Sequence, residues 1–344
     1  MTEVSDQRSG VSKIEERKSM TKKVFYIALC TMLLALCVAA EAQQPAPVRI
    51  GWISNDRGGN SPMFDAFRDG MRELGYVEGR NVIIEPHWGE GSNERLERLA
   101  VELVRSNPQV IVTQGGPATY PVVRAGATMP IVFGFSGDPV EGKLVESFAR
   151  PGRNLTGVSL LSLELVGKRM ELLKEVLPAL KRVAILANPQ HPGEQGELHA
   201  SKSAAKQLGL ALEYFQLPVT AKLDDTLPAV AKSRSGAIVV FPDAYMMRLS
   251  ERIAEFAVKN RTPAISGWAS FADDGNLMTY GPNLRDSYKR LAYYVDRILK
   301  GTKPAALPVE LPMKIELVIN LRAAKQLGLT ISQSVLYRAD RVIK

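Results

Sequence analysis

The stretches VRIGWIS (residues 48–54) and SPMFDAFRDGMRELGY (residues 61–76) set the pattern that the rest of the chain repeats. The first is a short apolar run, which is typical of a buried strand. The second places Met63, Phe67 and Met71 four residues apart, the spacing of one face of a helix. Together they predict a strand followed by a helix, the repeating unit of α/β proteins.

The same alternation continues along the chain. Residues 81–136 hold three more apolar runs, NVIIEPHW, VIVT and IVFGFS, separated by helix-period segments, and we expect a further helix that ends near Arg150. After RPGRNLTGVS (150–159) the pattern begins again at VGKRMELLKEVLPAL (166–180) and continues to PAISGW (263–268). The sequence therefore predicts two α/β halves, each a parallel sheet with helices on both faces.

Composition excludes several classes of function. The chain has 344 residues, 45% hydrophobic and 23% charged, which suits two globular domains. Its net charge of +8 is spread along amphipathic helices opposite Glu, so we expect no nucleic acid partner. Cys30 and Cys37 lie together near the N-terminus and the three histidines form no ligand set, so we expect no metal and no cofactor. No Gly-x-Ser-x-Gly elbow is present, and we expect no enzymatic activity.

The N-terminal segment has the features of an export signal. Lys22 and Lys23 precede an apolar core, and Ala40-Glu41-Ala42 fits the small-x-small cleavage rule. We therefore expect a signal peptide over residues 1–42, a mature chain that begins at Gln43, and a periplasmic location.

Three features of this segment leave alternatives open. The polar stretch before the basic pair indicates that Met20 is the true start. The 17 apolar residues approach the length of a membrane-spanning helix, so an uncleaved anchor is an alternative. Acylation at Cys37 would need a small preceding residue, and Leu36 stands there instead.

The stretch VIVTQGGPATYP (residues 110–121) joins a strand to a helix with almost no loop. In open α/β sheets, ligands bind beyond the carboxyl ends of the strands, where helix N-termini direct free N–H groups. Gly115 and Gly116 would let the backbone approach a ligand closely. We expect Thr119 to be the N-cap with Pro121 in the first turn. The stretch predicts a seat for a carboxylate; a tight turn with a cap is the alternative.

Polar residues follow the other strands in the same way. Because parallel strands end at one edge of a sheet, these residues from both halves would face one another across a cleft. Each Asp or Asn also has an explanation as a helix cap, Asp138 before Pro139 included, and each aromatic residue has one as core. The candidate ligand-binding residues are Ser54, Asn55, Gly115, Gly116, Thr119, Ser136, Asp138, Asn188, Asp243 and Trp268.

Over residues 47–344 the chain resembles the substrate-binding proteins of ABC importers, in the group with tryptophan- and phenylalanine-binding members. The segments that carry the resemblance are VRIGWIS, FRDGMRELGYVEGRNVIIE, ERLERLAVELVRSNPQVIVTQGGPAT, MPIVFGFSGDPVEGKLVESFARPGRNLTGVS, KRMELLKEVLPALKRVAILANP and LPVELPMKIELVINLRAAKQLGLTISQSVLYRADRVI. The resemblance implies a type I periplasmic-binding fold, in which two doubly wound parallel-sheet lobes are joined by three crossovers and a solute is trapped between them.

The resemblance also sets expectations for lobes, ligand and partners. It implies a first lobe of residues 47–157 plus 276–304 and a second lobe of residues 158–275 plus 305–344. It implies a monomer that carries a small organic solute, such as an amino acid or aromatic acid, to the permease subunits of an ABC importer. A ligand-sensing domain that docks on a membrane receptor is the alternative, and the sequence does not fix the identity of the ligand.

The chain departs from the pattern of the family at two places, one of which is Pro121, in a helix start that is usually rich in Ala. Phe241-Pro242-Asp243-Ala244 stands where amino-acid-binding relatives have Thr-Asp-Asn, so that Asp243 matches and its neighbours do not.

Overall fold

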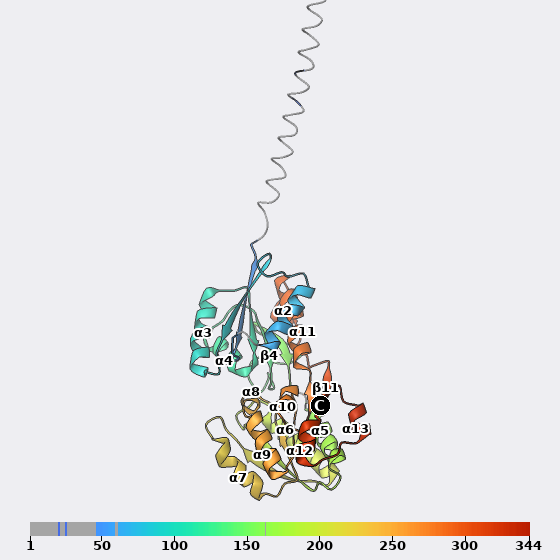
Figure 1. Ribbon diagram of the computed structural model, residues 1–344. Helices are drawn as coiled ribbons and strands as arrows, with labels where there is room; N and C mark the ends of the chain where they lie inside the picture. The colour runs from blue at the N-terminus through green and yellow to red at the C-terminus, as the bar shows by residue number, and fades with distance from the viewer. Residues whose placement is uncertain (1–19, 21–24, 26–45, 59–60, 162) are drawn as a thin grey trace, which may run out of the picture. The chain divides into compact units, whose positions relative to one another are not determined.

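The computed structural model describes residues 20, 25, 46–58, 61–161 and 163–344. From residue 48 onward the chain forms two sheets, each covered by helices (Figure 1). The expected signal peptide, residues 1–42, lies outside the described residues except at two positions. No helix in the described part of the chain has both the length and the apolar character needed to cross a membrane.

Lobe one, as we name it here, is built on a parallel sheet that has five strands among the described residues, in the order β2-β1-β3-β4-β5. Its strands alternate between two apolar cores, because successive side chains of a strand point to opposite faces. Ile50 and Trp52 join one core and Ile53 joins the other. The elements are β1 (Val48–Ser54), α2 (Pro62–Glu73), β2 (Val82–Trp88), α3 (Asn93–Ser106), β3 (Val110–Gln114), α4 (Gly115–Arg124), β4 (Ile131–Phe135) and β5 (Leu155–Ser159).

Helix α11 (Leu284–Leu299) comes from late in the sequence and packs beside α2 on this lobe (Figure 1). Its Tyr288, Leu291 and Val295 share a core with Trp52 and Phe67.

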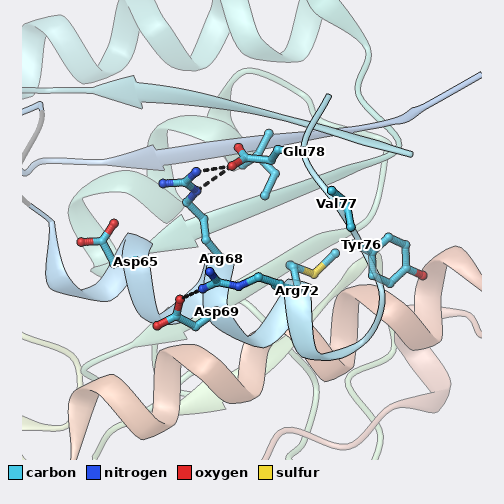
Figure 2. A pocket seen from close by; sticks show the side chains of 9 residues that line it. Asp65, Arg68, Asp69, Arg72, Tyr76, Val77 and Glu78 are labelled. Atoms are coloured by element: carbon cyan, nitrogen blue, oxygen red, sulfur yellow. Dashed lines mark hydrogen bonds and ion pairs between the residues drawn. The ribbon is translucent and has the colours of Figure 1, made fainter. Parts of the chain in front are cut away.

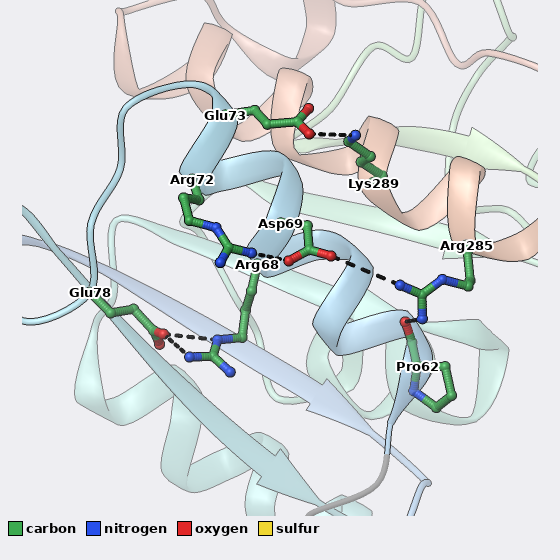
Figure 3. Close-up of polar contacts among 8 residues, drawn as sticks. All are labelled: Pro62, Arg68, Asp69, Arg72, Glu73, Glu78, Arg285 and Lys289. Carbon is green, nitrogen blue, oxygen red and sulfur yellow. Dashed lines mark hydrogen bonds and ion pairs between the residues drawn. The ribbon is translucent and has the colours of Figure 1, made fainter.

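Exposed ion pairs border the seam between these two helices (Figure 3). Lys289 Nζ lies 2.7 Å from Glu73 Oε1, and Arg285 Nη2 lies 3.9 Å from Asp69 Oδ2. Solvent-exposed pairs of this kind contribute about 0–1 kcal/mol each, so the buried apolar contacts fasten α11 to the lobe.

Lobe two, the second sheet with its helices, has seven strands among the described residues, in the order β12-β11-β10-β9-β8-β6-β7. Its two faces are covered by separate apolar cores. The elements are α5 (Glu164–Val176), β6 (Arg182–Ala187), α6 (Glu194–Leu208), β7 (Ala211–Gln216), α7 (Leu223–Lys232), β8 (Ala237–Val240), α8 (Ala244–Met247), α9 (Ser250–Asn260), β9 (Ala264–Ser266), α10 (Ala269–Asp273), β10 (Met278–Pro282), β11 (Ile315–Asn320), α12 (Leu321–Leu327), α13 (Gln333–Tyr337) and β12 (Arg341–Ile343). A short 3₁₀ helix, η1 (Pro304–Ala306), lies between α11 and β11.

The second sheet is not parallel throughout. Strand β10 pairs in parallel with β9 but antiparallel with β11. The reason is the path of the chain: β10 leads out of lobe two toward α11, and β11 leads back in, so the two neighbours run in opposite directions. The expected parallel sheet is therefore mixed at this edge.

Strand pairing also moves the expected boundaries between the lobes. Strand β10 lies in the second sheet, although the expected first lobe includes residues 276–304, and the chain passes to lobe one only after β10, at Asn283. Strand β5 continues to Ser159, past the expected boundary at 157. The segment 304–310 stays with lobe one, where Glu310 bridges to Val158 of β5. In the described chain the passages between sheets therefore follow β5, β10 and residue 310.

The helix expected to end near Arg150 is absent. Residues 139–143 form a turn, and residues 144–150 have no regular structure. Asp138 Oδ1 accepts hydrogen bonds from the amides of Val140 and Glu141, at 2.7 and 3.1 Å, as a cap would. Lys143 then adopts a left-handed φ of 56°, which stops a helix from continuing.

Candidate functional site

The carboxyl ends of strands from both sheets enclose a cavity of about 330 Å³, which we call the main cavity. Lobe one contributes the ends of β1, β3, β4 and β5 together with α11, and lobe two contributes α8 and the segment after β9. This is the place that the strand-end pattern predicts. The lining residues include Asn55, Asp56, Met63, Gln114, Gly115, Pro117, Ser136, Leu160, Ala244, Met247, Arg248, Trp268, Asp274, Leu284 and Tyr288.

Several residues that line this cavity carry buried polar side-chain atoms without a hydrogen-bond partner. In the described part of the chain they include Nδ2 and Oδ1 of Asn55, Oε1 of Gln114 and Nε1 of Trp268, all from residues that line it. Trp268 is 8% exposed. An unmade hydrogen bond of a buried group costs about 1–3 kcal/mol, so these groups require partners that a ligand can supply.

Asp56 fixes the orientation of this polar wall. Its Oδ2 accepts hydrogen bonds from Ser61 Oγ at 2.7 Å and from Gln114 Nε2 at 2.9 Å. Because the amide nitrogen of Gln114 is held in this way, its Oε1 remains directed elsewhere and unpartnered. Asp56 itself lines the cavity as a carboxylate at its lobe-one side.

Helix α4 begins five residues earlier than the sequence predicts, with its N-cap at residue 114 and not at 119. It starts at Gly115, with Gln114 in the N-cap position but without a side-chain cap, and Pro121 lies inside the helix. Thr119 is therefore not the N-cap. Its Oγ1 donates to the carbonyl of Gly115 at 2.8 Å and lies 2.7 Å from Thr113 Oγ1, in the interior of lobe one.

Tyr288 of α11 occupies part of the expected carboxylate seat. Burial and the nearby carboxylate of Asp56 raise the pKa of its hydroxyl, while a backbone hydrogen bond from Gly115 lowers it. The hydroxyl also donates to the carbonyl of Gly134 at 3.1 Å. Gly115 and Tyr288 both line the main cavity, and the glycine contributes bare backbone to its wall.

A smaller cavity of about 160 Å³, the side cavity, adjoins the main one. Asp243 of lobe two caps α8, with Oδ1 accepting from the amide of Met246 at 2.6 Å and Oδ2 from Asn188 Nδ2 at 3.0 Å. From lobe one, Ser136 Oγ lies 3.1 Å from Nε2 of His191 of lobe two. Burial lowers the pKa of His191, whereas the carboxylates of Asp243, Glu141 and Glu194 raise it.

Asp274 and Arg248 stand at the lobe-two side of the main cavity. Ser250 Oγ donates to the carboxylate of Asp274, and burial is the main cause of the raised pKa of this group. The exposed Arg248 lies over the ring of Tyr245, 5.7 Å from its centroid.

A third hollow, of about 240 Å³, lies along α2 and is lined by charged side chains (Figure 2). There Arg68 pairs with Glu78 and Arg72 pairs with Asp69, so these charges satisfy one another. No group of metal-ligating side chains was found among the described residues. The main cavity, with its unpartnered groups, is therefore the candidate ligand site.

A family model described as ABC transporter substrate binding protein matches residues 58–343. The chain belongs to this family. The ABC domain from Streptococcus pneumonia, solved in complex with L-Trp, is 25% identical with a TM-score of 0.79, over 87% of this chain and 100% of that chain. A conserved domain protein from Vibrio cholerae is 31% identical with a TM-score of 0.76 over the same shares. The tyrosine-binding protein of Clostridioides difficile is 21% identical over 76% of this chain and 75% of its own length. The expected type I periplasmic-binding fold is thereby confirmed.

In this substrate-binding protein, the expected site residues fall into three groups. Asn55, Gly115, Ser136 and Trp268 line the main cavity. Gly116, Asn188 and Asp243 line the side cavity together with Ser136. Three candidates line neither: Ser54, Thr119 and Asp138.

These last three have structural roles instead. Ser54 is fully buried, and its Oγ accepts from the amide of Asp56 at 3.1 Å. Thr119 forms hydrogen bonds in the interior of lobe one, and Asp138 accepts hydrogen bonds from the amides of the turn at residues 139–143.

Sequence reasoning missed Asp56 and Gln114. Each is the immediate neighbour of a candidate residue, Asn55 or Gly115; Asp56 follows β1, and Gln114 is the last residue of β3. A wider window at each strand end would have included them. No such signal identifies Leu284 and Tyr288, because their helix, α11, lies more than 100 residues after the strands of lobe one in the sequence.

Proposed function

We propose that this substrate-binding protein captures a small organic solute with a carboxylate, such as an amino acid or an aromatic acid, and delivers it to an ABC importer. The observation that carries the proposal is the set of unpartnered polar atoms on Asn55, Gln114 and Trp268, three residues that line the main cavity. A volume of about 330 Å³ lies at the small end of the range for ligand pockets, which suits a solute of this size.

The unpartnered atoms call for a solute with both acceptors and donors. Asn55 Nδ2 and Trp268 Nε1 are donors, and a carboxylate would accept from them. Asn55 Oδ1 and Gln114 Oε1 are acceptors, and the Gln114 amide contacts the carboxylate of Asp56; an ammonium group would donate to such acceptors. An α-amino acid carries both groups on one carbon atom.

The rest of the wall suits an apolar body. Met63, Leu160, Met247 and Leu284 line the cavity with the rings of Trp268 and Tyr288. The L-Trp complex of one relative and the name of the tyrosine-binding protein agree with an aromatic amino acid as a candidate. Capture requires only hydrogen bonds and burial, so the proposal includes no catalytic step.

The proposal extends to location and partners. The features of residues 1–42 support export and cleavage before Gln43, and membership of the family supports permease subunits of an ABC importer as the partners of a monomeric protein. N-terminal sequencing of the exported protein tests the cleavage. A chain that begins at Met20, or one that stays in the membrane after a high-salt wash, would contradict the periplasmic assignment.

A thermal-shift screen tests ligand capture. The mature protein is heated with amino acids, aromatic acids and short carboxylates, and a ligand at 100 times its dissociation constant should stabilise it by about 2.7 kcal/mol. Failure of the whole panel to raise the melting temperature would count against the proposal.

Two tryptophan variants locate the site. Trp268→Phe removes an unpartnered N–H from the main cavity and should weaken the stabilisation by the ligand. Trp52→Phe is the matched control, because Trp52 Nε1 is also buried and unpartnered but lies in the core of lobe one. Its ligand-induced shift, measured from its own ligand-free melting temperature, should match that of the wild type.

A further inference from the structure

A single cation stands among the described residues that line the main cavity. This is Arg248, the residue that follows α8 in lobe two. It also lines a hollow of about 450 Å³ between the lobes, which we call the polar hollow. Its guanidinium group lies over the ring of Tyr245, and in the described part of the chain it forms no ion pair and no hydrogen bond. Its hydrogen-bonding capacity is therefore free for a solute.

A carboxylate of lobe one lines the same two spaces. Asp56 follows β1 and borders both the main cavity and the polar hollow, as Arg248 does. Hydrogen bonds from Ser61 and Gln114 hold this carboxylate against lobe one. Asp56 and Arg248 form no ion pair with each other, although they carry opposite charges and both are described. The cavity is thus bordered by a negative group from one lobe and a positive group from the other.

Charges separated in this way match a solute that carries both signs. An ammonium group toward lobe one and a carboxylate toward lobe two would each meet an opposite charge, and the attraction grows as the solute displaces water. A guanidinium group can hold a carboxylate by two parallel hydrogen bonds.

The neutral polar groups agree with this orientation. The unpartnered Gln114 Oε1 is an acceptor on lobe one, and the unpartnered Trp268 Nε1 is a donor on lobe two. Asn55 has both a donor and an acceptor without partners, so it can serve either end of the solute.

We propose that the main cavity selects the zwitterion of an aromatic α-amino acid, with the ammonium group held on lobe one by Asp56 and the carboxylate held on lobe two by Arg248. This inference rests on the proposed function and narrows its substrate class from carboxylate-bearing solutes to amino acids. The solute then joins the two lobes through its own charges, and Arg248 is the residue that determines specificity for the carboxylate.

Asp274 is a second carboxylate on the wall of the main cavity, and it belongs to the same lobe as Arg248. Ser250 Oγ already donates to it, and burial is the main cause of its raised pKa. A carboxyl group with a raised pKa holds its negative charge less readily, which makes Asp274 the poorer partner for an ammonium group. Its part is tested below beside that of Asp56.

Three probes separate the two charges of the solute. L-tyrosine carries both, tyramine lacks the carboxylate, and phloretate lacks the ammonium group. Isothermal titration of the mature wild-type protein should give L-tyrosine an affinity at least about tenfold above each of the others, since a hydrogen bond to a charged group is worth that much. L-tryptophan, tryptamine and indolepropionate form a second set. If neither set shows the preference for the amino acid, the inference is overturned.

Arg248→Gln tests the carboxylate end. It should lower the affinity for the amino acid at least about tenfold and leave that for the amine nearly unchanged, so the preference between them disappears. Arg252→Gln is the matched control, because Arg252 lies one helical turn later, pairs with Asp224 and lines none of the three spaces. If Arg248→Gln keeps the preference as Arg252→Gln does, Arg248 does not hold the carboxylate.

Asp56→Asn tests the ammonium end against Asp274→Asn. Asp56→Asn should remove the preference for L-tyrosine over phloretate, whereas Asp274→Asn should keep that preference. The opposite result would place the ammonium group on lobe two and overturn the orientation. An equal loss for all three probes in Asp56→Asn would show that Asp56 only supports the wall, and it too counts against the placement.

The outcomes distinguish this inference from the function on which it rests. If phloretate or indolepropionate binds as tightly as the amino acid, the zwitterion inference fails and the proposed capture of a carboxylate-bearing solute stands. The same holds if neither set binds but another carboxylate of the thermal-shift screen does. If only the amines bind, both fail.

Discussion

The hydroxyl group of Thr119 joins α4 to the end of β3. It bonds to Thr113 Oγ1 and to the carbonyl of Gly115, and the side chain is fully buried. We expect Thr119→Val to lower the free energy of unfolding by about 1–3 kcal/mol, because Thr113 Oγ1 loses its partner inside the protein. Urea unfolding measures this loss. Affinity for a ligand found in the screen should stay unchanged, and a parallel loss of affinity would return Thr119 to the binding site.

Glu197 makes the stability of lobe two depend on pH. This fully buried carboxylate lies 3.3 Å from Nη1 of Arg169, and burial raises its pKa to about 7 despite the opposing effect of the arginine. Because the folded pKa lies above the ordinary value near 4.5, the folded state holds the proton more tightly. The contribution to stability is therefore complete below about pH 4.5 and is lost as the pH rises through about 7.

We expect the wild type to lose stability from pH 5 to pH 8 relative to Glu197→Gln, by an amount on the order of 1–3 kcal/mol. The variant keeps an amide beside Arg169 but cannot titrate. Urea unfolding of both proteins at several pH values gives the difference between their free energies of unfolding. The contributions of the other titrating groups cancel in this difference. Parallel stability curves would show that Glu197 keeps its ordinary pKa.

At the scale of single residues, one rule predicts several of the residues that line the candidate site. Asn55, Gly115, Ser136 and Trp268 follow strands in the sequence, and they line the main cavity. The rule identifies positions but not side-chain directions. Ser54, at the very end of β1, therefore turns inward instead of lining the cavity.

At the scale of elements, the start of α4 depends on one unusual backbone conformation. Gly115 has a φ of +74°, and a Cβ there would meet nothing closer than Pro117 Cδ at 3.5 Å. We expect Gly115→Ala to cost about 1–2 kcal/mol of stability, since the left-handed conformation strains any residue with a Cβ while no clash contributes.

Gly116→Ala is the matched control for this prediction. Gly116 has no left-handed φ, and its Cβ would lie 3.2 Å from the ring of Phe135. The gain of about 0.5–1 kcal/mol from replacing glycine within a helix should offset this tight contact. Thermal unfolding of both variants should therefore place Gly115→Ala below Gly116→Ala, and equal stabilities would contradict the role of the backbone at residue 115.

The periodic pattern predicted the strands of both sheets well, and it failed where periodicity was absent. No spacing of apolar residues supported a helix over 139–150, where the left-handed Lys143 interrupts the chain. For α4, Thr119 was a plausible cap by residue type. The helix begins earlier because Gly115 can turn the chain directly after Gln114. The pairing of β10 depends on the path of the chain through lobe one, which no local signal reveals.

At the scale of the whole molecule, residues 136–138 of lobe one contact residues 191–193 of lobe two. Ser136 Oγ bonds to His191 Nε2, and the amide of Asp138 donates to the carbonyl of Pro192 at 3.2 Å. The repeated alternation of strands and helices predicts two lobes. It does not predict which loops come into contact, because such contacts depend on how the lobes approach one another. These bonds hold the lobes together beside the side cavity.

This contact predicts that ligand affinity falls at low pH. Burial lowers the pKa of His191 below its ordinary value of 6.5 while it bonds to Ser136, against the opposing effect of Asp243, Glu141 and Glu194. Separation of the lobes would expose the ring and return its pKa toward that value. The joined arrangement is therefore favoured fully above pH 6.5 and progressively less as the pH falls through the lowered pKa. We expect affinity for a ligand from the screen to be constant above about pH 7 and to weaken toward pH 5.

Calorimetric titration across this range, on the wild type and two variants, tests the assignment. His191→Asn keeps a side chain that can bond to Ser136 but cannot titrate there, so its affinity should change less with pH. His199→Asn is the control, because His199 is exposed on α6, outside the contact between lobes; it should follow the wild type. An amino acid keeps its ammonium and carboxylate charges between pH 5 and 7, so the ligand adds no slope of its own. If His191→Asn follows the wild type as closely as His199→Asn does, the pH dependence arises elsewhere, and the bond between Ser136 and His191 contributes to closure without sensing protons.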